Sequence, residues 1–344
     1  AVDLRRPEGL KLVFELALRS DVLVQNFRPG TAEKMGLGYQ ALRERHPRLV
    51  YCSISGFGSR GAGRDLPGFD QSAQAMSGLM SVTGTDSTGP LRVGIAIGDS
   101  TAGVFAALGI VCALYELERT GLGQRVETSL MESLLTLMSY QAQKYLSLGE
   151  VAGRDGNDHP LMFPQGTFQT QDVPITLASG NEVMWRRLCE VIGAPELAED
   201  DRFRDNALRM RHRVELRRLI EQELAQRPAA EWLELINGAG IPASPIYSID
   251  QALNAEVTNS LEMVADVEHA SIGPLRVLGL PFKLGDQDRW LRLPPPVLGQ
   301  HSIEVCHDLG LSPGEVQELL DTRTILDGSR SRLPAEAASS SAAI

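Results

Sequence analysis

The chain has 344 residues, of which 33 are basic and 44 acidic, so its formal net charge at pH 7 is −11. Neutralising phosphates requires a basic protein face, and this charge therefore argues against a general nucleic-acid binder. Hydrophobic residues make up 43% and charged residues 22% of the chain, a globular composition that excludes wholesale disorder. The length fits two domains, or one large and one small domain.

Cysteine spacing and apolar runs predict the setting in which the protein works. The four cysteines are far apart and form no Cys-x-x-Cys motif or Cys/His pair, so we expect a reduced, cytoplasmic setting and no metal site. No apolar run approaches the ~20 uninterrupted residues of a membrane span, and no signal peptide is recognised. We therefore expect neither a membrane nor a nucleic acid as a partner.

The first half of the chain alternates short apolar runs with helical patterns. Helical spacing, turn signals and Thr31 as a helix cap predict helices over 7–19, 31–35 and 71–80, strands over 22–24 and 49–54, and a glycine-dense loop over 56–68. Further along, apolar runs predict a strand over 93–97, a long helix over 102–119, a strand over 126–129 and a helix over 131–148.

Strands that alternate with helices imply βα units and a mostly parallel sheet. We therefore expect an α/β fold with a large, Rossmann-like parallel-sheet domain, followed by a smaller α+β domain that contains a strand pair and helices over 203–227 and 229–239. The expected organisation is the first part of the large domain over 1–150, a linker over 151–166, the small domain over 167–273, a return to the large domain over 274–328, and a disordered tail over 329–344.

A Gly-x-Gly-x-x-Gly motif, Gly56 to Gly61, follows a predicted strand. A dinucleotide site would require a helix to begin at the third glycine, with its amino terminus against the pyrophosphate. Here the residues after Gly61 include Gly63 and Pro67, which do not favour the start of a helix. We interpret the segment as a flexible loop at a site, not as a nucleotide-binding turn.

Asp99 is predicted to lie at a strand-to-helix junction, between Gly98 and Gly103. In one interpretation, Asp99 or Ser100 is the helix N-cap and accepts amide hydrogen bonds. In the other, the glycines let a substrate approach a carboxylate that the helix end keeps ionised. Such a carboxylate can attack a thioester as a nucleophile and divide acyl transfer into two easier steps.

Several motifs in fixed order resemble the class III CoA-transferase family, the group of formyl-CoA transferase and carnitine-CoA transferase. They are NFRPG…KMGLGY, LVYCSISGFG, LPGFDQSAQAMSGLM, GPLRVGIAIGDSTAG, TGLGQRVETSL, AGIPASPIYSIDQAL, GLPFKLG and PPPVLGQH. The similarity extends from residue 1 to about residue 322. In that family the aspartate of the GDSxxG segment is the acyl-accepting nucleophile, and this position corresponds to Asp99.

The resemblance implies a ping-pong transfer of CoA from a donor acyl-CoA to an acceptor carboxylic acid, through an aspartyl-CoA thioester on Asp99. CoA is then a substrate, and no tightly bound cofactor is expected. Backbone amides at the start of the helix after Asp99 are expected to stabilise the oxyanions. By family position, the residues expected to contact CoA are Asn26, Phe27, Arg28, Lys34, Met35, Phe69 and Asp70. The alternative for 26–35 is a turn followed by a solvated helix.

The racemase branch of the superfamily carries a histidine in a Gly-His-Asp segment, where this chain has Gly68, Phe69 and Asp70. Phenylalanine cannot transfer a proton, so an acyl-CoA racemase or epimerase activity is disfavoured. Phe69 is expected to line the acyl or pantetheine pocket. Nothing in the sequence identifies the donor or acceptor acid.

The resemblance also implies an interlocked homodimer and a chain that begins after the family's first βα unit. An alternative function follows, namely a truncated, non-catalytic chain that dimerises but binds CoA poorly.

Overall fold

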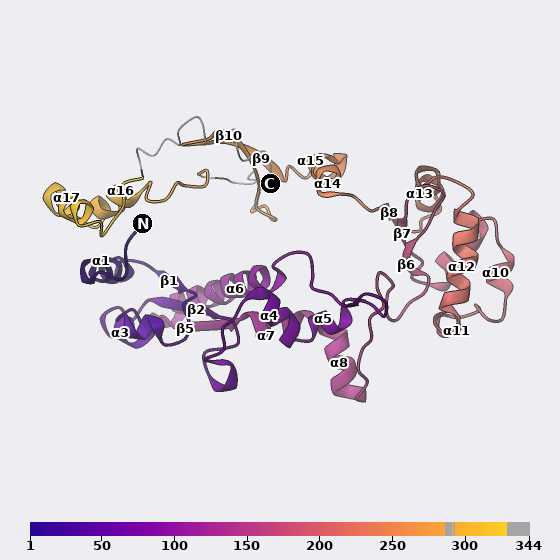
Figure 1. The fold of residues 1–344 in the computed structure, drawn as a ribbon, viewed down its shortest axis with the longest axis horizontal. Coiled ribbons are helices and arrows are strands. Elements are labelled where there is room, and N and C mark those ends of the chain that lie inside the picture. Colours follow the sequence, from indigo (N-terminus) through magenta and orange to yellow (C-terminus); the bar gives the residue numbers. More distant parts are fainter. Residues whose placement is uncertain (286–290, 292, 329–344) are drawn as a thin grey trace. The chain divides into compact units, whose positions relative to one another are not determined.

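The computed structural model describes residues 1–285, 291 and 293–328 (Figure 1). The chain divides into two compact units. The first unit contains Ala1–Met80, Arg92–Val151 and Glu256–Ile344, and the second contains Ser81–Leu91 and Ala152–Ala255. The predicted tail over 329–344 lies outside the described residues.

The first unit is built on a three-stranded parallel sheet with the order β1-β2-β5. Its strands are β1 (Val22–Gln25), β2 (Val50–Ser55) and β5 (Arg125–Ser129). The central strand, β2, begins with the fully buried residues Val50, Tyr51 and Cys52, as expected for a strand that is covered on both faces. The α/β fold predicted from the alternation of strands and helices is confirmed.

Helices cover both faces of this sheet. Tyr51 packs with Ala17 of α1 (Pro7–Ala17) and Leu42 of α3 (Tyr39–Arg45). Val50 packs with Ala113 of α6 (Ile97–Thr120). Because consecutive strand residues point to opposite faces, α6 lies on the other side of the sheet from α1 and α3. Figure 1 shows α6 beside β2 and β5.

The segment 93–97 is not a strand, and that prediction is wrong. α6 begins at Ile97, so Asp99 lies in its first turn and not at a strand end. The reason is a tertiary one: side chains of α4 (Asp70–Met76) bind the backbone of this segment. Gln74 Oε1 accepts a hydrogen bond from the Val93 N–H at 2.8 Å, and Asp70 Oδ1 accepts one from the Gly98 N–H at 2.7 Å. Side chains of α4 therefore satisfy backbone N–H groups at the start of this segment and just after its end.

Three predicted helices are each divided in two. The residues at the breaks include Gly78 and Ser139, both with positive φ, which a helix cannot continue through. The resulting pairs are α4 with α5 (Leu79–Val82), α7 (Leu130–Leu137) with α8 (Ser139–Leu148), and α11 (Asn206–Arg211) with α12 (Arg213–Leu224).

The second unit contains a three-stranded antiparallel sheet, β6-β7-β8, and a separate hairpin of β3 (Gly84–Thr85) and β4 (Gly89–Pro90). Its core contains Trp185, Phe203 and Ile220. The remaining elements of this unit are β6 (Gln165–Phe168), β7 (Ile175–Ala178), α9 (Glu182–Val191), α10 (Glu196–Glu199), α13 (Ala229–Gly238), β8 (Ala243–Pro245) and α14 (Ile249–Asn254).

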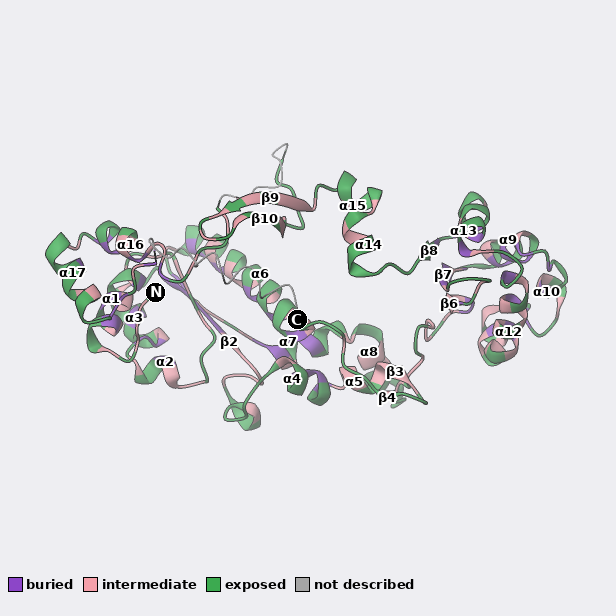
Figure 2. Cartoon of the chain, turned by 45° about the horizontal axis from the view of Figure 1, so that its top comes forward, coloured by how far each residue is buried: buried purple, intermediate pink, exposed green. Residues whose placement is uncertain are grey.

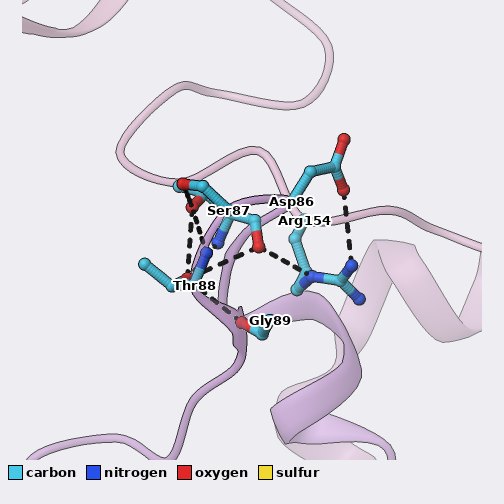
Figure 3. A network of polar contacts seen from close by, with 6 residues as sticks. Asp86, Ser87, Thr88, Gly89 and Arg154 are labelled. Atoms are coloured by element: carbon cyan, nitrogen blue, oxygen red, sulfur yellow. Dashed lines mark hydrogen bonds and ion pairs between the residues drawn. The ribbon is translucent and has the colours of Figure 1, made fainter.

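The turn of the β3–β4 hairpin is held by Arg154 (Figure 3). Arg154 Nε donates to the Thr85 carbonyl at 3.1 Å, and its guanidinium pairs with Asp86 at 3.3 Å. Asp155 and Asp158, which follow Arg154, pair with Arg213 and Arg217 of α12. Residues within the segment predicted as a linker over 151–166 therefore form ion pairs inside the second unit.

The chain returns to the first unit at α15 (Glu256–Ser260), ahead of the predicted boundary at 273. β9 (Val264–His269) pairs with β10 (Gly273–Leu278), so a boundary at 273 would divide one hairpin. The last helices are α16 (Ser302–Asp308) and α17 (Pro313–Asp321). This part packs against Leu12 of α1 through Cys306, Leu309 and Val316. The remaining short helical elements of the first unit are α2 (Thr31–Lys34) and the 3-10 turn η1 (Gly61–Gly63).

Among the described residues, α6 has the length and composition of a helix that could cross a membrane. The sequence predicted a long helix over 102–119, and Asp99 and the charged last turn keep its apolar centre below ~20 uninterrupted residues. In the structure α6 packs on β2 and β5.

Candidate functional site

A cavity of ≈ 530 Å³ opens at the carboxyl ends of β1 and β2, where parallel sheets usually bind ligands. Asp99 lies in its wall, and Phe57 and Leu130 contribute apolar surface. The complete lining is Asn26, Phe27, Arg28, Pro29, Ile54, Ser55, Gly56, Phe57, Gly58, Arg64, Leu66, Gly68, Phe69, Asp99, Gly103 and Leu130.

The glycine-rich loop over 56–68 forms one wall of this cavity. A Cβ atom added at Gly56 would lie 2.5 Å from the Cα of Gly68, so the two glycines let the ends of the loop touch. The helical part of the loop is the single 3-10 turn η1, which is too short to direct a helix amino terminus at a phosphate. The loop therefore shapes the Asp99 cavity, in agreement with the rejection of a dinucleotide-binding turn.

Asp99 is placed by the first turn of α6. Ala96 is the N-cap of this helix, and no side chain at the N-cap makes a capping hydrogen bond, so the interpretation of Asp99 or Ser100 as the N-cap is wrong. Desolvation by the surrounding protein, and secondly the negative charge of Asp70, raise the pKa of Asp99 above its ordinary value. The amino end of α6 favours the carboxylate form, because the helix dipole is positive there.

Asp70 and Gln74 hold the start of α6 from the neighbouring helix α4. Asp70 Oδ1 accepts the Gly98 N–H, and Asp70 Oδ2 accepts a hydrogen bond from Gln74 Nε2 at 2.6 Å. Gln74 is fully buried. A Cβ at Gly98 would approach Asp70 Oδ1 to 2.9 Å, so a glycine at this position gives the carboxylate room. Asp70 is thus a positioning residue beside Asp99.

The amides next to Asp99 are already used. The Gly98 N–H binds Asp70, and the Ser100 N–H donates to the Ala96 carbonyl at 3.0 Å. The expectation that amides at the start of the helix stabilise an oxyanion therefore fails for these two groups, because tertiary and helical hydrogen bonds satisfy them first.

A second, basic cavity of ≈ 640 Å³ adjoins the first, and the two share Phe27, Pro29, Ile54, Ser55 and Arg64 as lining residues. Four cationic side chains line the basic cavity, namely Lys34, Arg60, Arg64 and Arg125, together with one carboxylate, Glu33. Arg125 also pairs with Glu127 at 2.7 Å. A cavity with this charge suits a ligand that carries phosphates.

The predicted site residues are distributed over both cavities. Asn26, Phe27, Arg28, Phe69 and Asp99 line the first cavity, Phe27 and Lys34 line the basic cavity, and Met35 and Asp70 are not among the described residues that line either one. For all of these residues, contact with CoA stays a prediction. The alternative interpretation of 26–35 was a turn followed by a solvated helix. The structure has a turn followed by the short helix α2, in which Lys34 is exposed.

Sequence reasoning missed Gln74, Arg60, Arg64 and Arg125. A signal was present for some of them: Asp70 and Gln74 are four residues apart and so share one helix face, and the loop GSRGAGR carries two arginines. In the described part of the chain, no group of three or more His, Cys, Asp or Glu residues gathers at metal-binding distance.

A model of the family described as CoA-transferase family III matches residues 1–302. The chain belongs to CoA-transferase family III. It is 38% identical to the acetyl-CoA:oxalate CoA-transferase of Acetobacter aceti over 285 residues, which cover 82% of this chain and 72% of that relative. It is 33% identical to the succinyl-CoA:glutarate CoA-transferase of Mus musculus over 321 residues, which cover 93% and 74% respectively.

A solved structure agrees with this membership in CoA-transferase family III. The crystal structure of a CAIB/BAIF family protein from Brucella suis matches with a TM-score of 0.78 and 31% sequence identity, over 90% of this chain and 80% of that chain. The predicted resemblance is confirmed, and with it the enzyme class: the chain is a CoA-transferase, an enzyme that acts on CoA thioesters.

Proposed function

We propose that this chain transfers CoA from a donor acyl-CoA to an acceptor carboxylic acid through a covalent aspartyl-CoA thioester on Asp99. One observation carries the proposal: Asp99 is the only carboxylate among the described residues that line the first cavity, and this cavity adjoins a basic one. A nucleophile for the thioester thus lies beside a place for phosphates. The relatives named for oxalate and glutarate support CoA transfer between acids.

The proposed reaction begins with attack of an Asp99 carboxylate oxygen on the thioester carbonyl carbon of the donor. The C–S bond breaks, CoA leaves as a thiolate, and Asp99 becomes part of a mixed anhydride. The thiolate then attacks the aspartyl carbonyl carbon, the donor acid leaves as a carboxylate, and the aspartyl-CoA thioester remains. An acceptor carboxylate repeats these two steps in reverse order, which gives the new acyl-CoA and free Asp99.

The two cavities divide the CoA molecule between them in this proposal. Lys34, Arg60 and Arg125 of the basic cavity bind its phosphates, because guanidinium and ammonium groups pair with phosphate oxygens. The pantetheine arm extends along Phe27, which lines both cavities, and brings the thioester to Asp99. Phe69, which is 74% exposed in the chain by itself, covers the acyl group.

We also propose a homodimer that works in the cytoplasm. Val104, Leu108, Val111 and Tyr115 are 66%, 58%, 62% and 67% exposed and follow one another at intervals of four, three and four residues. This spacing places them on one face of α6, which is largely exposed in Figure 2. An apolar face of this kind favours cover by a second copy. The four free cysteines fit a reducing compartment.

Intact-protein mass spectrometry tests the covalent step. Wild-type protein and Asp99→Ala are mixed with acetyl-CoA, oxalyl-CoA or succinyl-CoA, and half of each sample is then treated with hydroxylamine. We expect a CoA-sized adduct on the wild type alone, and its loss with hydroxylamine. Folded wild-type protein that forms no adduct and transfers no CoA with any donor contradicts the proposal and favours the non-catalytic alternative.

A further inference from the structure

We propose that the negative charge of Asp70, fixed beside the first turn of α6, favours the covalent forms of Asp99 over the free carboxylate. The inference rests on the proposed function of Asp99 and deepens it, because it names a residue that sets the balance between free and covalent enzyme. Asp70 is not among the described residues that line the cavity. It acts through Asp99 and is therefore a positioning residue, not a catalytic one.

Both carboxylate oxygens of Asp70 are held in place. Oδ1 accepts the Gly98 N–H at 2.7 Å, and Oδ2 accepts Gln74 Nε2 at 2.6 Å. Gln74 is fully buried, and its Oε1 accepts the Val93 N–H at 2.8 Å, so a rotation of this side chain would leave buried groups unpaired. An ionised carboxylate accepts hydrogen bonds and donates none, and two N–H donors match it. The charge of Asp70 is therefore fixed next to the residue that precedes Asp99.

The surroundings of Asp70 leave its charge largely uncompensated. In the part of the chain that the structure describes, Asp70 forms no ion pair. The neighbourhood of Gly98 is apolar, because a Cβ at this position would lie 3.2 Å from Leu134 Cδ1, and Leu134 packs in a buried cluster with Ala73 and Ala102. Charges interact more strongly across apolar surroundings than across water. The charge of Asp70 therefore acts on the start of α6 from a partly dry side.

The electrostatics of Asp99 agree with this placement. Burial, and secondly the charge of Asp70, raise the pKa of Asp99. Arg28 and Arg64 line the same cavity, yet the pKa is raised and not lowered, so burial and the negative neighbour outweigh them. Asp99 is exposed in the chain by itself, and water screens part of the repulsion between the two carboxylates. A neighbour that favours a bound proton also favours a bound acyl group, since both remove the charge of Asp99.

The charge balance of the reaction links this repulsion to the covalent forms. In the first two steps together, the Asp99 carboxylate and an acyl-CoA give the aspartyl-CoA thioester and the free donor carboxylate. No proton and no electron is gained or lost, and one negative charge passes from Asp99 to the departing acid. The enzyme changes from two neighbouring carboxylates to one. The charge of Asp70 therefore raises the free energy of the free enzyme but not that of the anhydride or the thioester.

A double variant separates the charge of Asp70 from its hydrogen bonds. In Asp70→Asn alone, the new amide group faces Gln74 Nε2, which is also a donor. When Gln74→Glu is added, the amide at position 70 can donate to the carboxylate at position 74, and the Gly98 and Val93 N–H groups keep their acceptors. The long hydrogen bond from Gln74 to the Ile95 carbonyl, at 3.4 Å, is lost. The double variant thus keeps three hydrogen bonds and the net charge, and moves the charge away from Gly98.

The experiment measures the equilibrium between free and covalent enzyme in the full chain. The donor is whichever of acetyl-CoA, oxalyl-CoA and succinyl-CoA forms the adduct on the wild type, and its own acid is added at increasing concentration. Intact-protein mass spectrometry after an acid quench gives the fraction of adduct, and from it the equilibrium constant K for aspartyl-CoA formation. Wild type, Asp70→Asn and the double variant are compared with Glu118→Gln, which removes an exposed charge from the other end of α6, ~30 Å away. Hydrogen exchange of peptides over 93–105 reports whether the start of α6 is intact.

We expect K to fall about 3- to 30-fold in Asp70→Asn, the range for like charges on neighbouring helices at effective dielectric constants between ~20 and ~80. Glu118→Gln leaves K unchanged. The double variant protects the start of α6 as well as the wild type does, but its K stays nearer to that of Asp70→Asn than to that of the wild type. A merely structural role of Asp70 would instead make protection and K recover together.

Three results would overturn the inference. In the first, K of Asp70→Asn, or of the double variant where the single variant does not fold, equals that of the wild type. In the second, K falls equally in Glu118→Gln, which would assign the effect to net charge. In the third, the double variant recovers both K and protection in full, which would assign the effect to the hydrogen bonds alone. Failure of the proposed function itself is separate, since the wild type would then form no aspartyl thioester with any donor.

Discussion

Two glycines of α6 are expected to respond in opposite ways to substitution by alanine. A Cβ at Gly103 would meet no heavy atom within 4 Å, whereas a Cβ at Gly109 would lie 2.7 Å from Val126 Cγ1. Gly103 faces the Asp99 cavity one turn after Asp99, and Gly109 lies where α6 crosses β5. The pair therefore separates the effect of helix propensity from the effect of close packing within one helix.

The magnitudes follow from these two surroundings. Replacing glycine by alanine in a helix interior contributes about 0.5–1 kcal/mol, and nothing at Gly103 opposes this gain. At Gly109 the new methyl group would be about 1 Å inside the optimal carbon–carbon separation. Val126 is β-branched and stiff, so relief requires the helix to move, and overpacking of this kind costs about 1–3 kcal/mol. We expect Gly103→Ala to be about 0.5–1 kcal/mol more stable and Gly109→Ala about 0–2.5 kcal/mol less stable.

The same two substitutions are expected to affect catalysis in the reverse order. The methyl group of Gly103→Ala occupies space in the Asp99 cavity, so aspartyl-CoA formation slows although the protein is more stable. The methyl group of Gly109→Ala lies behind the helix, so the folded fraction still forms the adduct. Stability and activity should therefore change in opposite directions at Gly103.

Hydrogen exchange of peptides from α6 and β5 is the appropriate stability assay. Trp185 and Trp232 both lie in the second unit, so their fluorescence does not report on α6 and β5, whereas exchange measured on peptides does. Mass spectrometry of the CoA adduct measures activity in the same samples. The steric argument is refuted if α6 of Gly109→Ala is as well protected as α6 of Gly103→Ala.

Three further predictions concern charge. Because the pKa of Asp99 is raised in the folded chain, Asp99→Asn should unfold at a higher temperature than the wild type at pH 7. This difference in unfolding temperature should fade as the pH falls toward the ordinary aspartate value of 3.8. A difference that persists in acid would contradict the prediction. Asp70→Asn removes the charge that contributes to this shift, so the acid limb of the kcat/KM profile should move to lower pH, and an unmoved limb would exclude Asp70 as a cause. Glu182→Ala leaves the buried Arg209 without its carboxylate and should lower the free energy of unfolding by about 3 kcal/mol, measured by urea unfolding with tryptophan fluorescence. The added change Arg209→Met should recover part of this free energy. No recovery would show that the ion pair is not the cause.

Much of the first unit could be predicted from short sequence patterns. The apolar runs over 22–24 and 49–54 became β1 and β2, as is typical of strands in a covered parallel sheet, and the predicted strand over 126–129 became β5. The glycine-rich loop and Asp99 were also found from the sequence. These are features whose cause lies within a few residues of the chain.

The failures have a common cause in contacts between distant residues. The run over 93–97 has the composition of a strand, yet its Val93 N–H binds Gln74, and the Gly98 N–H just after it binds Asp70. Arg64 was missed among 29 arginines, because its place in the wall of the Asp99 cavity is a property of the folded chain and not of its neighbours in sequence.

The sequence by itself determined the α/β fold and the family, because periodicity and ordered motifs are local and need no knowledge of what packs against them. Only the tertiary structure decided that Asp99 lies in the first turn of α6, that Asp70 holds this turn, and that the phosphate-binding and acyl-binding cavities we propose adjoin at Arg64. The physical reason is that hydrogen-bond satisfaction and electrostatic shifts depend on distance in space, and the chain brings these residues together only when it folds.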